Sequence, residues 1–353
     1  MIDKGYAEDV LLKLISTWSG PDADMQAILD LAAAEMKAIG LEPAINGELK
    51  AVSAHSRHGG VLFNGHLDTV PVGQGWTHRL GERDGALLYG RGTADMKGGI
   101  AAMLAAAKEL KAKDVPFSLL FTTDEETTMH AAAKLQNTGF VRKAAAVVVG
   151  EPTDLVIVGS EKGILWFEVT VRGRSAHGSM PHLGDNAILK ATKLLAAFEP
   201  YTRPKDHLAE LTVNIGAIDG GSKTNVVADL CAVDLDVRYP PHLSKEEAQR
   251  LVDSTIRIVG VPAEAQIKHE VPAVSVNENS DHIRKMKELA GPEVRTVPYG
   301  TEMAFYAQVN PRCLILGPGR PDMTHVPDEC VDLAQVAKAA EIYAKYAEAL
   351  GPM

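Results

Sequence analysis

The sequence predicts an α/β fold with a mainly parallel sheet, into which a smaller α+β segment is inserted. Short apolar runs alternate with stretches of helical periodicity in the first and last parts of the chain. Polar side chains follow the ends of four predicted strands, which is where open α/β sheets bind ligands. From residue 163 the order changes to strand, helix, two strands, helix and strand. We therefore expect a main domain of residues 1–162 plus 273–353 and an inserted domain of residues 163–272.

The main domain contains clear helix and strand patterns. Gly40 after the second helical stretch is typical of a helix C-cap. The alanine-rich stretch after Asp95 has apolar residues at helical spacing, so Asp95 is expected at a helix entrance. The expected helices are 7–17, 23–39, 98–113 and 333–350, and the expected strands are 51–55, 61–64, 117–123, 144–149 and 312–316.

The inserted segment has about a hundred residues, a size that suits an independent domain. Its candidate linkers are Gly159–Gly163 and Val271–Asn279. Its expected strands are 164–172, 211–216, 231–238 and 266–270, and its expected helices are 186–198 and 245–259.

Composition excludes several classes of protein. The 353 residues are 46% apolar and 23% charged, with a net charge of −10 and scattered basic residues, so a nucleic-acid partner is not expected. The N-terminus lacks a basic stretch followed by an apolar block, and the apolar run 98–107 is too short to span a membrane. The three cysteines lie far apart, which predicts neither a disulfide framework nor a thiolate zinc site. We expect a cytoplasmic protein without a membrane partner.

The stretch Gly60–Pro71 carries the first candidate site. An apolar run ends in Asn64-Gly65 and is followed at once by His66 and Asp68. Residues two apart in an extended segment point the same way, so both side chains are expected to face one site. This pairing suits a metal-binding imidazole whose second ring nitrogen is held by a carboxylate.

Further polar residues follow the other strand ends. They are Asp95, the pair Glu125 and Glu126, Glu151 and His325. Each has an ordinary explanation alone: the Glu pair suits a solvated turn, Gly-Glu-Pro is a common turn composition, and His325 suits a loop. The glycines around Asp95 do not form a phosphate loop, since no Gly-x-x-x-x-Gly-Lys-Ser/Thr occurs.

Carboxylates gathered at one crevice repel each other unless cations neutralise them. Two divalent ions satisfy this set, with Asp95 bridging, His66 and Glu151 on one ion, and Glu126 and His325 on the other. Imidazole and carboxylate ligands without thiolate suit zinc first, with cobalt or manganese as substitutes. Glu125 is then free to act as the general base.

Five motifs in order resemble the zinc-dependent deacylase and exopeptidase family, which includes acetylornithine deacetylase, succinyl-diaminopimelate desuccinylase, aminoacylase and glutamate carboxypeptidase. They are Gly65-His-Leu-Asp-Thr-Val-Pro71, Gly90-Arg-Gly-Thr-Ala-Asp-Met-Lys-Gly-Gly99, Asp124-Glu-Glu126, Gly150-Glu-Pro-Thr153 and His325. The resemblance covers essentially the whole chain. It implies the same ligand set, Glu125 as general base, and an inserted domain that serves as lid and dimerisation domain.

The resemblance extends into the inserted segment. Residues 172–186 match the family's lid motif, which implies that His177 reaches a partner's site in a homodimer and stabilises the tetrahedral intermediate. Asn225 and Arg238 resemble lid positions that bind the substrate's carbonyl and carboxylate.

The substrate is the least determined property. Tyr299-Gly-Thr-Glu302 and Gly317-Pro-Gly look more like acetylornithine deacetylases than desuccinylases, and Glu302 is expected either to line the pocket or to cap a helix. Thr127–His130 stands where family members usually carry glycines. A metallo-dipeptidase or carboxypeptidase, and a non-catalytic ligand-binding homologue, remain alternatives to an N-acyl amino acid amidohydrolase.

Overall fold

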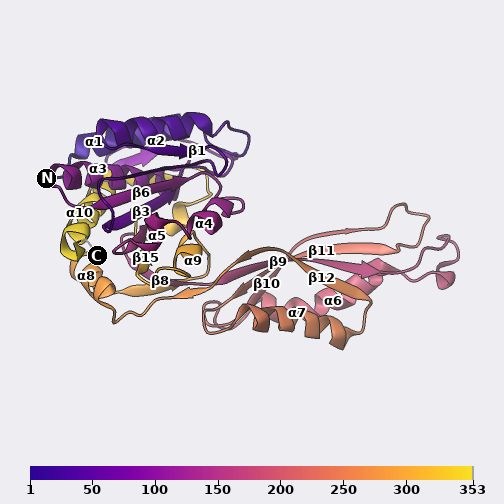
Figure 1. Cartoon of the computed structure of the whole chain (residues 1–353). Coiled ribbons are helices and arrows are strands. Elements are labelled where there is room, and N and C mark those ends of the chain that lie inside the picture. Colours follow the sequence, from indigo (N-terminus) through magenta and orange to yellow (C-terminus); the bar gives the residue numbers. More distant parts are fainter. Residues whose placement is uncertain (352–353) are drawn as a thin grey trace. The chain divides into compact units, whose positions relative to one another are not determined.

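The computed structural model describes residues 1–351, which divide into two compact units (Figure 1). Unit 1 contains residues 1–159, 276–295 and those from Thr301 onward. Unit 2 contains residues 160–275 and the short return segment 296–300. The sequence had placed this return in the main domain. It belongs to unit 2 because β14 (Val294–Val297) pairs with β8 (Ile157–Glu161), and the amide of Lys162 donates to the carbonyl of Val297.

The α/β fold class is confirmed by a mixed sheet whose centre is parallel. Strand β3 is parallel to β6 and β7, and β7 is parallel to β15. Strands β3, β6 and β7 are buried along their whole length, as expected for parallel strands covered on both faces. The strand order is β1 (Ala44–Asn46), β2 (Ala51–His55), β6 (Phe117–Thr122), β3 (Val61–His66), β7 (Val147–Val149), β15 (Cys313–Ile315), β8 and β13 (Val274–Ser275).

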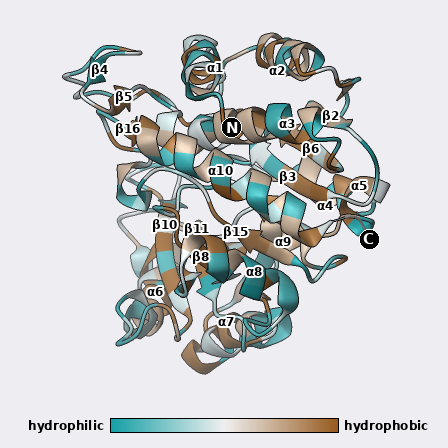
Figure 2. Cartoon of the chain, turned by 90° about the vertical axis from the view of Figure 1, so that its left-hand side faces the viewer, coloured by the Kyte–Doolittle hydropathy of each residue, from teal (hydrophilic) through white to brown (hydrophobic). Residues whose placement is uncertain are grey.

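Helix α3 (Gly98–Ala112) lies at the centre of the packing in unit 1. It packs against α1 (Lys4–Ser16), α10 (Leu333–Leu350) and strand β3. Eleven of its residues are buried, many of them alanines, so it lacks the polar face of a surface helix. In contrast, α10 carries both hydrophilic and hydrophobic residues along its ribbon in Figure 2. Ile342 and Tyr343 are among its buried residues.

The remaining elements of unit 1 are short. Asp3 caps α1 by accepting the amide of Tyr6, and Asp332 caps α10 by accepting the amide of Ala334. A small antiparallel sheet contains β4 (Arg83–Asp84), β5 (Leu87–Tyr89) and β16 (Cys330–Asp332). The other helices are α2 (Gln26–Ala38), α4 (His130–Leu135), α5 (Gly139–Arg142), α8 (Asp281–Ala290), α9 (Met303–Tyr306), and the single turns η1 (Thr93–Lys97) and η3 (Pro321–Met323).

Unit 2 is a four-stranded antiparallel sheet with two helices. The strand order is β10 (Thr212–Gly220), β11 (Leu230–Tyr239), β9 (Gly163–Arg172) and β12 (Ala263–Val271). The helices α6 (Ala187–Thr202) and α7 (Lys245–Val259) pack on this sheet, and η2 (Pro181–Leu183) precedes α6. Asn186 caps α6, and Ser244 with Glu247 forms a capping box at α7.

The expected linker at 159–163 contains the boundary between the two units, but much of it is a strand rather than a loop. Strand β8 occupies most of it, because Val158 pairs with Ile315 of β15 and Glu161 pairs with Val274 of β13. Glycine at 159 suggested a loop, but a Cβ there would lie only 2.9 Å from Val276 and Val294 side chains, so the glycine serves close packing. Among the described residues, no helix is long and apolar enough to cross a membrane.

Candidate metal centre

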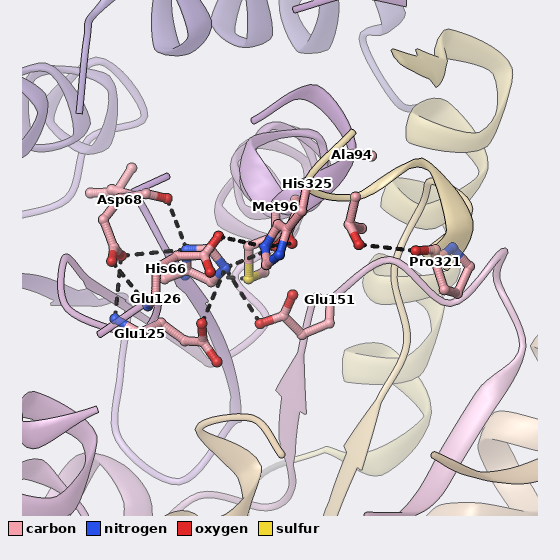
Figure 3. A network of polar contacts seen from close by, with 12 residues as sticks. His66, Asp68, Ala94, Met96, Glu125, Glu126, Glu151, Pro321 and His325 are labelled. Carbon is pink, nitrogen blue, oxygen red and sulfur yellow. Dashed lines mark hydrogen bonds and ion pairs between the residues drawn. The ribbon is translucent and has the colours of Figure 1, made fainter. Parts of the chain in front are cut away.

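Parallel strands bring the candidate residues to one edge of the sheet. His66 ends β3, Glu125 and Glu126 follow β6, Glu151 follows β7, and His325 follows β15. These four strands are neighbours in the sheet. Their carboxyl ends therefore converge, and Figure 3 shows the side chains pointing toward one another.

The first ligand group contains His66, Asp95 and Glu151. Their ligand atoms lie within 4.8 Å of one another. Nε2 of His66 is 3.1 Å from Asp95 Oδ1 and 3.6 Å from Glu151 Oε1. All three side chains are largely buried, so this group could enclose an ion.

The second group contains Asp95, Glu126 and His325, again within 4.8 Å of one another. Nε2 of His325 is 3.2 Å from Asp95 Oδ2 and 3.1 Å from Glu126 Oε1. The two oxygens of Asp95 thus face different histidines, which is the arrangement a bridging carboxylate requires. The structure brings together the five residues that the sequence assigned as ligands, in the same two groups.

Asp68 supports both groups without belonging to either. Its backbone carbonyl lies 3.0 Å from His66 Nδ1, and its carboxylate oxygen lies 3.4 Å from the same nitrogen. The carboxylate also accepts the amides of Glu125 and Glu126 at 3.4 and 3.1 Å. Asp68 therefore orients the imidazole and the Glu pair together.

Glu125 occupies a different position from Glu126. Its Oε2 is 4.0 Å from His66 Nε2, and it belongs to neither ligand group. Burial and the negative charges of Glu151, Glu126 and Asp95 raise its pKa well above the usual value, against the attraction of His66. A buried carboxylate with a perturbed pKa, beside the candidate ligands, is a candidate for acid–base chemistry.

The electrostatics of the cluster fit cations. Burial raises the pKa of Glu151 to about 7, and hydrogen bonds to Asp95 and Glu126 raise that of His325 to about 10. Burial alone would lower the pKa of His66, but Glu151 and the bonds to Asp68 and Asp95 raise it well above its usual value. Without ions, the cluster therefore holds protons to balance its charge. Oε1 of Glu151 is buried and accepts no hydrogen bond, so it offers a free lone pair to a metal.

Three glycines allow the strand end that carries Glu151 to fit between its neighbours. A Cβ on Gly99, at the start of α3, would lie 2.2 Å from the carbonyl oxygen of Gly150. A Cβ on Gly317 would lie at the same distance from that oxygen, on the β15 side. The Gly-Gly, Gly-Glu and Gly-Pro-Gly motifs are thus explained by close backbone approach.

The residues in place of the usual glycines form a turn held by Asp124. The carboxylate of Asp124 accepts the hydroxyl of Thr128 at 3.1 Å and the amide of Ala131 at 3.0 Å. Met129 adopts a left-handed conformation with φ of 51° and precedes α4. No ligand is displaced by this departure from the family pattern.

Sequence reasoning missed Glu329, which is fully buried below Asp95. Its Oε1 accepts the amides of Ala94 and Asp95 at 2.9 and 3.1 Å, and its Oε2 lies 2.6 Å from Arg91 Nη1. Glu329 therefore fixes the backbone of the bridging ligand. The available signal was a carboxylate four residues after His325, inside Pro-Asp-Glu-Cys, which by itself is typical of a turn.

The expected lid residues lie in unit 2. Residues His177 and Val226 form an isolated bridge, and the amide of Gly178 donates to the carbonyl of Asn225 at 2.7 Å, so His177 and Asn225 are neighbours. The side chain of His177 is exposed, and its Nδ1 lies 2.7 Å from the Ser179 hydroxyl. Arg238 on β11 makes a two-point ion pair with Asp236.

Glu302 lies at the start of a helix, as one of the two expectations held, but its side chain does not take a capping role. It occupies the N-cap position of α9. The side chain is 1% exposed, and its Oε2 accepts the amide of Asn64 at 2.8 Å. Burial excludes it from a solvent-facing pocket wall, and burial raises its pKa to about 8.

Comparisons with known proteins identify the family of the chain. Residues 62–349 match the family described as Peptidase family M20/M25/M40. An acetylornithine deacetylase from Vibrio vulnificus is 35% identical over 352 residues, covering 91% of this chain and 92% of that protein. Two solved structures share the fold. They are the aminopeptidase PepT from Bacillus cereus (TM-score 0.80, 21% identity, 99% of both chains) and the Bacillus subtilis YXEP protein, titled a dinuclear metal binding peptidase (TM-score 0.74, 16% identity, 98% of both chains).

Proposed function

The chain belongs to peptidase family M20/M25/M40, and on that premise we propose that it removes the acyl group from an N-acyl amino acid, with N-acetylornithine as the first candidate substrate. Family and site together make it a metal-dependent hydrolase of amide bonds. The observation that carries the proposal is the pair of ligand groups joined by Asp95, with Glu125 beside them.

Two metal ions fit this donor set. His66, Asp95 and Glu151 would hold one ion, and Asp95, Glu126 and His325 would hold the other. Zinc is the proposed metal, with cobalt or manganese as substitutes, because the donors are imidazole and carboxylate without thiolate. The ions would supply Lewis acidity to the amide carbonyl and lower the pKa of the attacking water towards about 7.

Glu125 is the proposed general base. Its carboxylate lies within reach of the space between the two groups, and the amides of residues 125 and 126 are anchored on Asp68, which limits its movement. It accepts the proton of the attacking water and delivers it to the leaving amine. Burial raises its pKa, which strengthens it as a base and favours the protonated form needed for that delivery.

Unit 2 is proposed as the lid and dimerisation domain. His177 would contribute to the site of the partner chain in a homodimer, and Asn225 and Arg238 would contact the substrate's carbonyl and carboxylate. Support comes from the lid motif, from the exposure of His177, and from the backbone bonds that hold residues 177–178 beside 225–226.

The acetyl substrate is favoured by the relatives. The Vibrio vulnificus deacetylase matches nearly the whole of both chains at 35% identity, whereas the peptidase structures are at most 21% identical and support only the fold. A dipeptidase or carboxypeptidase is therefore the second candidate.

A substrate panel tests the proposal. Zinc-loaded protein and zinc-loaded Glu125→Gln protein are assayed on N-acetylornithine, N-succinyl-diaminopimelate and several dipeptides. We expect the highest kcat/KM on N-acetylornithine and at least about 100-fold loss of kcat in the variant. A dipeptide with the highest kcat/KM would establish the second candidate. Bound zinc with no turnover of any compound would instead support a non-catalytic homologue.

A further inference from the structure

The backbone of Asp95 has an influence on both candidate metal sites, because its carboxylate belongs to both ligand groups. Its Oδ1 lies 3.1 Å from Nε2 of His66, and its Oδ2 lies 3.2 Å from Nε2 of His325. A shift of the Asp95 backbone would therefore move ligand atoms of both groups at once. Any residue that fixes this backbone can affect metal binding without contacting an ion itself.

Glu329 makes two of the hydrogen bonds that fix this backbone. Its Oε1 accepts the amide of Ala94 at 2.9 Å and the amide of Asp95 at 3.1 Å. The residue is 0% exposed, so solvent water does not compete for these amides. Glu329 belongs to neither ligand group, and its carboxylate is therefore committed to the backbone rather than to an ion.

The turn before Asp95 has the form of a backbone anion site. Gly92 has a φ of 86°, in the left-handed region that glycine adopts readily. The successive amides of Ala94 and Asp95 then donate to one oxygen. Turns of this kind, with consecutive amides converging on one point, bind anions. In this chain the anionic group is supplied by Glu329, from more than two hundred residues further along the sequence.

Arg91 keeps the carboxylate of Glu329 in this position. Its Nη1 lies 2.6 Å from Oε2 of Glu329, and its Nη2 donates to the carbonyl of Val72 at 3.1 Å. The cation offsets the cost of burying an ionised carboxylate and leaves Oε1 to the two amides. The backbone of Glu329 is held as well, because its carbonyl accepts the amide of Gly90 at 2.9 Å.

We propose that Glu329 is a positioning residue of the metal centre, which acts through Asp95 and raises the affinity for both ions together. Arg91 supports it by holding the carboxylate in place. The inference rests on the two-ion centre of the proposed function, and it gives Glu329 no contact with metal or substrate. A ligand of one group only, such as Glu126, should in contrast affect a single site.

A matched pair of double variants tests whether the acceptor oxygen, rather than packing or charge, is responsible. Both carry Arg91→Met, so that no buried cation is left without a partner. One adds Glu329→Gln, which keeps an oxygen for the two amides, and the other adds Glu329→Met, which has a similar size but no such acceptor. Competition with a chromophoric chelator measures the zinc affinity of each site. We expect the glutamine variant to bind both ions at least about tenfold more tightly than the methionine variant.

Two single variants complete the test. Glu329→Gln alone places an amide group against Arg91 and should weaken both sites about tenfold. It carries the test if circular dichroism in chelator shows that the methionine double variant does not fold. Glu35→Met replaces another buried glutamate of unit 1, which pairs with Lys13 at 2.7 Å. This control should change neither affinity.

Equal affinities of the two double variants for both ions would overturn the proposal, and so would a difference confined to one site. Glu35→Met weakening both sites as much as the changes at Glu329 would also overturn it. If the methionine double variant does not fold, unchanged affinities in Glu329→Gln have the same meaning. Amide hydrolysis is not the readout, so a parent chain that binds two ions but cleaves no amide rejects the proposed function and leaves this inference standing. A parent chain that binds fewer than two ions overturns both.

Discussion

Replacing Glu302 by glutamine is expected to stabilise unit 1, by an amount that grows with pH. The carboxyl group is 1% exposed, and Asn64 donates to it at 2.8 Å. Burial raises its pKa from 4.5 to about 8, so the folded protein holds Glu302 neutral at pH 7 while the unfolded chain ionises it. Glutamine has nearly the same shape and keeps an oxygen for Asn64, but it cannot ionise.

The magnitude follows from the two pKa values. An acid whose pKa is higher in the folded state costs no stability below about pH 4.5, and the cost rises until about pH 8. At 1.36 kcal/mol per unit of pH, the cost is about 3 kcal/mol at pH 7 and about 5 kcal/mol above pH 8. The variant lacks this cost, so its stability relative to the parent should increase over the same range.

Urea unfolding at several pH values measures the difference. In a Trp166→Phe background the remaining tryptophans, Trp18 and Trp76, both belong to unit 1, so fluorescence reports that unit alone. Both proteins are kept in chelator, and Glu48→Gln, at an exposed glutamate of unit 1, is the matched control. A stability difference that stays constant from pH 5 to pH 8 would refute the reasoning that burial keeps Glu302 neutral.

Three further predictions concern the metal centre. Glu125→Gln should retain two ions per chain by elemental analysis while Glu126→Gln retains about one, and the opposite pattern would exchange their roles. Zinc binding at pH 7 should release at least about one proton, because His325, with a pKa of about 10, is protonated without metal. Calorimetry in buffers of different ionisation enthalpy measures the number of protons released. A release of zero protons would contradict this prediction. Mixing inactive Glu125→Gln with inactive His177→Ala chains should restore some activity if His177 serves the partner's site. Absence of recovery despite demonstrated chain exchange would argue against a shared site.

The grouping of the candidate ligands was predictable because most of them follow a strong local strand pattern. A short apolar run identifies a buried strand, and the polar residue after it must then lie at the strand's carboxyl end. Parallel pairing of β3 with β6 and β7, and of β7 with β15, brings four such strand ends to one edge of the sheet. The strand–glycine–acid pattern at Gly150-Glu151 also predicted position correctly, although the reason for the glycine, its contact with Gly99 and Gly317, required the structure.

Glu302 and Glu329 show why the rest could not be predicted. Both carboxylates lie in turn-like sequence, where a glutamate is normally solvated, and both are almost fully buried. Each carboxylate accepts hydrogen bonds from donors more than two hundred residues away in the sequence. The donor is Asn64 for Glu302, and the donors are the amides of Ala94 and Asp95 for Glu329.

Such long-range hydrogen bonds leave no periodic pattern in the sequence, because each forms only when the fold brings one donor to one acceptor. The two sites differ in charge. Glu329 has the cation Arg91 at 2.6 Å, whereas Asn64, which donates to Glu302, is a neutral amide. A cationic partner offsets the cost of burying an ionised carboxylate, and a neutral amide does so far less. Glu329 is therefore suited to hold the backbone of Asp95 as an anion, while Glu302 beside β3 is suited to remain a neutral acid.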